Sequence, residues 1–168
     1  MLQRNLNALI ILILVGILAG AFGVQFIMHE QPCPLCLLQR LGMFGVAAGA
    51  AMNVHFNIRM SHYGVMLLSS IFGGFVALRQ ISLHVCPGFS EFGVPVLGLS
   101  LYTWSFFIFV CCITSVGLLL FLYDSKADQD HVPPASFLGR ASLWLILLLA
   151  IGNAIATFAQ CGLGVCEE

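Results

Sequence analysis

Two cysteines in the run Cys33-Pro34-Leu35-Cys36 lie where one long apolar segment ends and the next begins. Two thiols separated by two residues can form and break a disulfide, and can therefore carry two electrons. Proline suits the first turn of a helix, which would place Cys33 at a helix start and Cys36 within the first turn. The positive end of a helix favours the thiolate, the form that attacks disulfides. The pattern therefore indicates thiol redox chemistry.

Arg40 follows Cys36 by four residues, so a helix would place both side chains on one face, with Cβ atoms about 5–6 Å apart. Arginine in a membrane span costs roughly 2.5–3.5 kcal/mol at the bilayer centre, which suggests that this one has a function. We expect Arg40 to stabilise a thiolate or to hold a carbonyl oxygen of a lipid-dissolved electron acceptor. The alternative is that its guanidinium simply reaches the lipid headgroups.

The cysteine pair has two alternative interpretations, a structural disulfide and a metal site. Two thiols supply only half of a four-thiolate zinc site, and no close histidine completes one. We therefore expect redox-active cysteines and no metal ligands.

Composition places these residues in a membrane protein. Of the 168 residues, 60% are hydrophobic and only 8% are charged, against about 25% charged residues in soluble domains. A bilayer-spanning helix needs about 20 mostly apolar residues, so the sequence predicts an all-α bundle that forms one domain, residues 1–168, in the lipid bilayer. The connections are short, and no nucleic-acid footprint is present. The five predicted spans are residues 6–28, 36–53, 63–83, 97–123 and 141–159.

Basic residues predict the orientation, because short cytoplasmic loops retain lysine and arginine. With a cytoplasmic N-terminus and a retained first span, too long for a signal peptide, four of the six basic residues face the cytoplasm. Arg40 and Arg79 instead fall inside spans near the outer surface. Five cysteines also fall outside and none in a cytoplasmic loop, which suits an oxidising periplasm. The outer cysteines are Cys33, Cys36, Cys86, Cys161 and Cys166.

Other features of the spans are interpreted as packing devices. Cys111 and Cys112 are adjacent in a span, about 100° apart on a helix, and we expect them to be small apolar packers. The GxxxG spacings at residues 16–20 and 45–49 predict close helix approaches. Aromatic residues near span ends predict belts at the two membrane surfaces. These residues are Tyr63, Tyr102, Trp104 and Tyr123.

The run from Cys33 to Arg40 resembles the CxLCxxxR motif of the DsbB family, bacterial inner-membrane thiol:quinone oxidoreductases. Residues 97–99, Leu-Gly-Leu, followed by Trp104, resemble the family's pattern at the start of its fourth helix, and the order of the first four spans matches. The resemblance implies that ubiquinone or menaquinone reoxidises Cys33 and Cys36. It also implies that these cysteines reoxidise a DsbA-like dithiol oxidase in the periplasm.

Departures from the family concern the second cysteine pair, which members usually carry between the third and fourth helices. Here that loop holds only Cys86, while Cys161 and Cys166 follow a fifth C-terminal span that the four-helix members lack. Glycines at 162 and 164 permit a tight turn, so a disulfide between Cys161 and Cys166 is the easiest to draw. Pairing of Cys86 with either of them stays open. We expect these three cysteines to form the entrance of an electron relay, with its exit at Cys33 and Cys36.

The family also tends to carry a histidine near the outer end of the third helix that helps to form the quinone site. His84 is the nearest candidate for this role, and its alternative interpretation is a polar residue at the interface. His29, just before the cysteine pair, is a second and weaker candidate.

Two other functions stay open at this stage. A relative of vitamin K epoxide reductase would also be a small helical bundle with quinone chemistry, but its CxxC lies late in the chain. A non-enzymatic membrane protein could instead use the thiols to chelate a soft ion such as Cu(I).

Overall fold

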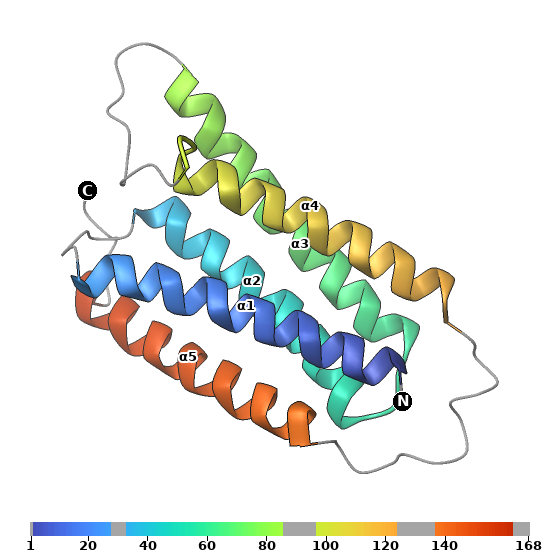
Figure 1. Ribbon diagram of the computed structural model, residues 1–168. Coiled ribbons are helices and arrows are strands. Elements are labelled where there is room, and N and C mark those ends of the chain that lie inside the picture. The colour runs from blue at the N-terminus through green and yellow to red at the C-terminus, as the bar shows by residue number, and fades with distance from the viewer. Residues whose placement is uncertain (1, 28–32, 86–96, 124–136, 163–168) are drawn as a thin grey trace.

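The computed structural model describes residues 2–27, 33–85, 97–123 and 137–162, and within these ranges it contains five α-helices. Each is long and apolar enough to cross a membrane, which confirms the predicted all-α, multi-pass architecture. Consecutive helices run in opposite directions (Figure 1). The helices are α1 (Leu2–Ile27), α2 (Pro34–His55), α3 (Met60–Val85), α4 (Leu101–Phe121) and α5 (Phe137–Cys161).

The start of α4 differs from the predicted span, which began at residue 97. Leu97 and Gly98 have φ angles of 54° and 79°, in the left-handed region that a right-handed helix excludes. Both residues form a turn, and α4 begins only at Leu101, after Ser100 at the N-cap position. The other four helices start before their predicted spans, because the hydrogen-bonded backbone continues past the apolar stretch that hydropathy detects.

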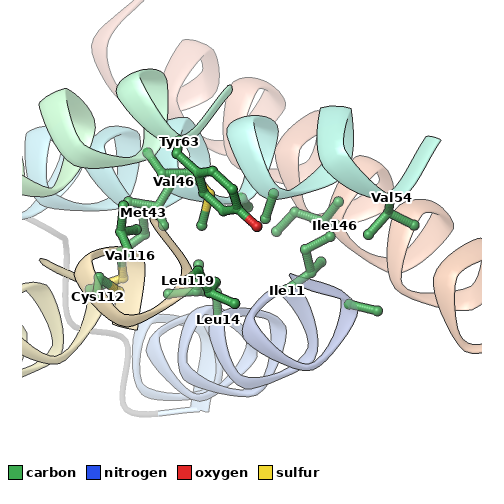
Figure 2. Close-up of a cluster of buried hydrophobic side chains, with 14 of the residues drawn as sticks. Ile11, Leu14, Met43, Val46, Val54, Tyr63, Cys112, Val116, Leu119 and Ile146 are labelled. Atoms are coloured by element: carbon green, nitrogen blue, oxygen red, sulfur yellow. The ribbon is translucent and has the colours of Figure 1, made fainter. Parts of the chain in front are cut away.

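Helix α2 lies at the centre of the bundle. It packs most extensively against α3 and also contacts α1, α4 and α5. The α1 and α5 helices lie side by side on one side of it, while α3 and α4 form a pair on the other (Figure 1). One continuous apolar core joins all five helices (Figure 2). It includes Ile11, Leu14, Met43, Val46, Tyr63, Cys112, Val116, Leu119 and Ile146.

The contact between α2 and α3 depends on glycine. A Cβ atom at Gly49 would lie 2.8 Å from the carbonyl oxygen of His62 and 3.0 Å from the backbone nitrogen of Met66. A Cβ atom at Gly45 would meet the side chain of Ser69. The predicted close approach at residues 45–49 is therefore confirmed, since the two backbones are too near each other for larger residues.

The same prediction is wrong for residues 16–20. Gly16 and Gly20 are exposed, and within the described part of the chain no atom lies within 4 Å of a Cβ built on either. A GxxxG spacing identifies a small helical face but not the direction in which that face points. In α1 it points away from the bundle.

A buried polar network occupies the end of the bundle opposite Cys33. Tyr63 is fully buried, and its hydroxyl accepts a hydrogen bond from Asn7 Nδ2 at 3.1 Å. Asn7 Oδ1 accepts from Asn53 Nδ2 at 3.2 Å, and Asn53 Oδ1 lies 3.0 Å from Nδ1 of His62. The prediction of a membrane-surface belt is thus wrong for Tyr63, because the buried amides of α1 and α2 need polar partners inside the protein.

An arginine joins α1 to α2 at this end. Arg4 is buried, and its Nη2 donates a hydrogen bond of 2.8 Å to the carbonyl oxygen of Phe56, the C-cap residue of α2.

The glycine in the α2–α3 contact and the exposed glycine of α1 give opposite predictions for replacement by alanine. Gly49→Ala should destabilise the protein by about 1–3 kcal/mol, as overpacking does, although alanine favours helix more than glycine. Gly16→Ala is the matched control and should be neutral or slightly stabilising. The midpoint of heat or SDS denaturation in detergent micelles measures both effects. Equal midpoints for the two variants would show that the α2–α3 contact does not require glycine.

Candidate active site

Cys33 and Cys36 lie at the N-terminus of α2, as predicted, with Pro34 as its first helical residue. Cys33 has extended backbone angles and is the N-cap residue, and its Sγ accepts a hydrogen bond of 3.1 Å from the backbone nitrogen of Cys36. The two sulfur atoms are joined as a disulfide, with Cα atoms 5.0 Å apart. One of the backbone donors that a helix start leaves unpaired is thus directed at sulfur.

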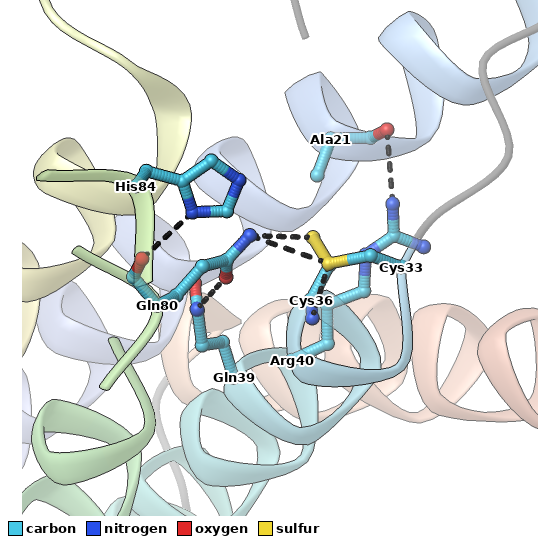
Figure 3. The surroundings of a disulfide bond; sticks show 7 residues. All are labelled: Ala21, Cys33, Cys36, Gln39, Arg40, Gln80 and His84. Atoms are coloured by element: carbon cyan, nitrogen blue, oxygen red, sulfur yellow. Dashed lines mark hydrogen bonds between the residues drawn. A yellow bond between two sulfur atoms is a disulfide. The ribbon is translucent and has the colours of Figure 1, made fainter. Parts of the chain in front are cut away.

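Two buried glutamines lie beside the disulfide, and neither was predicted from the sequence. Gln80 of α3 is 1% exposed, and its Nε2 lies 3.3 Å from Cys33 Sγ and 3.7 Å from Cys36 Sγ (Figure 3). Its Oε1 accepts a hydrogen bond of 2.6 Å from Nε2 of Gln39, which is also buried. The signal that could have found both is an uncharged amide inside an apolar span, where it must find a partner.

Arg40 lies one turn beyond Cys36 and is 8% exposed. Its Nη1 donates to Gln25 Oε1 at 2.8 Å, and its Nη2 donates to the carbonyl oxygen of Ala21 at 3.2 Å (Figure 3 draws the second bond). The guanidinium carbon also lies 5.0 Å from the centroid of the Phe22 ring, a cation–π distance. The side chain therefore bonds to α1 within the protein, and these contacts are not those of an arginine extended to the headgroups.

His84 lies one turn beyond Gln80 on α3. Its Nδ1 is 2.8 Å from the carbonyl oxygen of Gln80, and its ring stacks on that of Tyr102 in α4 at 4.9 Å between centroids. Tyr102 is buried, so the surface-belt prediction is wrong for this residue too. His84 is thus linked to the disulfide through Gln80, whose backbone oxygen lies against the His84 ring and whose side-chain amide lies against the two sulfur atoms (Figure 3).

The three predicted entrance cysteines cannot be compared with the structure. Cys86 and Cys166 lie outside the described residues, as does His29, and only the backbone of Cys161, at the end of α5, lies within them. The two span cysteines are free thiols: Cys112 packs in the core, whereas Cys111 is exposed on the helix surface. Within the described ranges, no group of three metal-ligating side chains is close enough to hold an ion.

Similarity to known proteins identifies the family to which this site belongs. Residues 3–91, which include α1 except its first residue, the disulfide, Arg40 and Gln80, match the family model described as "Disulfide bond formation protein DsbB". The chain belongs to the DsbB family. Its members are described as disulfide bond formation proteins.

Individual DsbB relatives show how far the likeness extends. "Disulfide bond formation protein B" of a Polaromonas species is 31% identical over 153 residues, which cover 71% of this chain and 90% of the relative. The protein of the same name from Burkholderia pseudomallei is 33% identical over 92 residues, 52% of this chain. "Disulfide bond formation protein B 1" of Pseudomonas fluorescens is 27% identical over 151 residues, 70% of this chain and 89% of the relative.

The chain spans about half the length of the Burkholderia relative, since the match covers 54% of that protein. No solved structure matches the chain significantly.

Peptide mapping without reduction tests the resting state of the site. Cys33 and Cys36 should be linked to each other, because the start of α2 holds them side by side as a pair, with Cα atoms 5.0 Å apart. Cys111 and Cys112 should be recovered as free thiols, alkylated after denaturation. A resting protein in which Cys33 is joined to any other cysteine would contradict this arrangement.

Proposed function

We propose that this chain is a membrane thiol:quinone oxidoreductase that supports disulfide bond formation. It reoxidises a DsbA-like, thioredoxin-fold dithiol oxidase of the periplasm and passes the electrons to ubiquinone or menaquinone in the membrane. The observation that carries the proposal is a disulfide at the N-terminus of a membrane helix, surrounded by buried polar donors, in a chain of the DsbB family. Such a disulfide can accept two electrons by thiol exchange, and the dithiol that results can pass them to a lipid-dissolved acceptor.

The first step proposed is thiol exchange at the entrance. The reduced partner attacks a disulfide formed among Cys86, Cys161 and Cys166. A thiolate released there then attacks Cys33 Sγ, forming a new S–S bond, and the electron pair of the broken Cys33–Cys36 bond goes to Cys36 Sγ. The partner's second thiolate closes the partner's own disulfide and releases the other entrance thiolate, which attacks the entrance sulfur bound to Cys33. The entrance disulfide forms again and the electron pair of the bond broken there goes to Cys33 Sγ, so Cys33 and Cys36 are both reduced. Cys33 is 9% exposed, so the attacking sulfur must enter the site to reach it.

The second step proposed is transfer to the quinone. The bound quinone supplies a two-electron acceptor that takes up two protons as the Cys33–Cys36 disulfide forms again. Arg40 would hold the oxygen on which negative charge develops. Two N–H groups of its guanidinium bond to α1, and a guanidinium has five, so donors remain for that oxygen. The stacked rings of His84 and Tyr102 are proposed to line the quinone site on the α3–α4 side.

The orientation and domain organisation belong to the same proposal. Residues 1–168 form one integral domain of a bacterial inner membrane, with the N-terminus in the cytoplasm and the C-terminus in the periplasm. The excess of basic residues on one side supports this orientation, and an odd number of spans places the two ends of the chain on opposite sides. The disulfide then faces the compartment that holds its protein substrate.

Quinone reduction by purified protein, driven by a reduced thioredoxin-fold dithiol protein, tests the chemistry. Cys33→Ser and Cys36→Ser should each abolish turnover, since either removes the disulfide. Arg40→Met should lower the rate about 100-fold, as the loss of a donor to a developing oxyanion does. Arg79→Met is the matched control, because Arg79 is exposed on α3, and it should retain the rate of the unmodified chain. Full turnover by Cys36→Ser would refute the relay.

Labelling with an impermeant maleimide tests the orientation in intact cells. A cysteine introduced at exposed Leu99, before α4, should react from outside. A cysteine introduced at exposed Phe56, between α2 and α3, should react only after the membrane is permeabilised. Labelling is read peptide by peptide so that native thiols do not interfere. The reverse pattern would leave the disulfide without a periplasmic donor and would end the proposal.

A further inference from the structure

The amide pair beside the disulfide has a fixed orientation. Gln39 donates to Gln80 Oε1, so the NH₂ group of Gln80 must point away from Gln39, and it points at the two sulfur atoms (Figure 3). Both amides are buried, with 5% and 1% of their surfaces exposed. The amide nitrogen of Gln80 lies 3.3 and 3.7 Å from the two sulfurs. Since the sulfurs are bonded to each other, both lie in nearly the same direction from this nitrogen, and one of its two N–H groups is shared between them.

This arrangement serves the reduced state better than the oxidised one. Sulfur in a disulfide is a weak acceptor, whereas a hydrogen bond to an ionised group is roughly twice as strong as one between neutral groups. A buried donor aimed at a disulfide is therefore poorly satisfied until an electron pair arrives on the sulfur. It then stabilises the thiolate without any rearrangement.

The two sulfur atoms differ in their other donors. Cys33 Sγ also accepts from the backbone nitrogen of Cys36 at 3.1 Å. For Cys36 Sγ, the contact from Gln80 is the hydrogen bond that the described residues supply. A thiolate on Cys36 thus depends on the Gln80 amide more than one on Cys33 does.

We propose that Gln80 is a catalytic hydrogen-bond donor that stabilises the Cys36 thiolate released when the Cys33–Cys36 bond breaks, and that Gln39 is its positioning residue. The inference deepens the proposed function and rests on it for its place in the reaction. In that step a thiolate attacks Cys33 Sγ and a new S–S bond forms there. The electron pair of the old bond goes to Cys36 Sγ, which already lies beside the side-chain N–H of Gln80. The amide pair therefore makes the disulfide a better electron acceptor.

The equilibrium of the Cys33–Cys36 couple tests this proposal without quinone or protein partner. The full chain is equilibrated in glutathione or dithiothreitol buffers. The reduced fraction is then counted by mass spectrometry on the peptide that carries both cysteines. Gln80→Met keeps the length of the side chain but has no N–H. It should shift the equilibrium constant about tenfold toward the disulfide, which for a two-electron couple is about 30 mV more negative.

Three further measurements separate a donor from a packing residue. Alkylation of Cys36 in the reduced Gln80→Met variant should be about tenfold slower at neutral pH, with its pH profile displaced to the alkaline side. Gln39→Met, which only releases the Gln80 amide, should shift the potential in the same direction by a smaller amount. Asn53→Leu, the matched control, removes a fully buried amide from the far end of α2. It should lower stability and leave the potential unchanged.

The proposal would be overturned by a Gln80→Met protein that still forms the Cys33–Cys36 disulfide and whose equilibrium constant for this couple stays within twofold of that of the unmodified chain. If Gln80→Met does not accumulate in membranes, Gln39→Met decides by the same criterion. A failure of the proposed function gives a different result. The unmodified chain would then reduce no quinone, while the equilibrium of its Cys33–Cys36 couple could still be measured.

Discussion

The close contact of α2 with α3 is the constraint on which the site depends. Gly49 lies against Met66, and Gly42 lies against Gly73. The two helices are therefore in a constant antiparallel register, in which moving toward the start of α2 corresponds to moving the same number of residues toward the end of α3. Helices are rigid and rise about 1.5 Å per residue, so this register continues to the end of the pair, where the Gln80 amide lies against Cys36 Sγ. The glycines in the middle of the membrane thus determine which side chain meets the sulfur atoms at its edge.

The polar side chains of this bundle are concentrated at its two ends. At one end the Gln39–Gln80 pair and Arg40 surround the disulfide, and at the other Asn7 and Asn53 bond to each other and to Tyr63 and His62. The apolar core adjoins the second network, because Tyr63 belongs to both (Figure 2). Since an unpaired polar group in an apolar interior costs several kcal/mol on transfer scales, each network restricts how its helices can pack.

Local features of this chain were predictable from the sequence, whereas features that depend on neighbours were not. Hydropathy predicted the five spans, and Pro34 predicted the helix start at Cys33, because both are properties of one segment. The burial of Tyr63, the outward face of Gly16 and the contact of Gln80 with sulfur depend on which helix lies opposite. The GxxxG spacing is the same at both sites, and only the fold distinguishes them.

Each of the first two helices carries an arginine that donates hydrogen bonds to the other helix. Arg4 of α1 bonds to the backbone at the end of α2, and Arg40 of α2 bonds to the backbone and an amide near the end of α1. Every group in these contacts lies within the first 56 residues, so the partners of both cations come from α1, α2 and the residue that caps α2. The α1–α2 hairpin therefore satisfies its own two arginines, with neither positive charge turned toward the acyl chains.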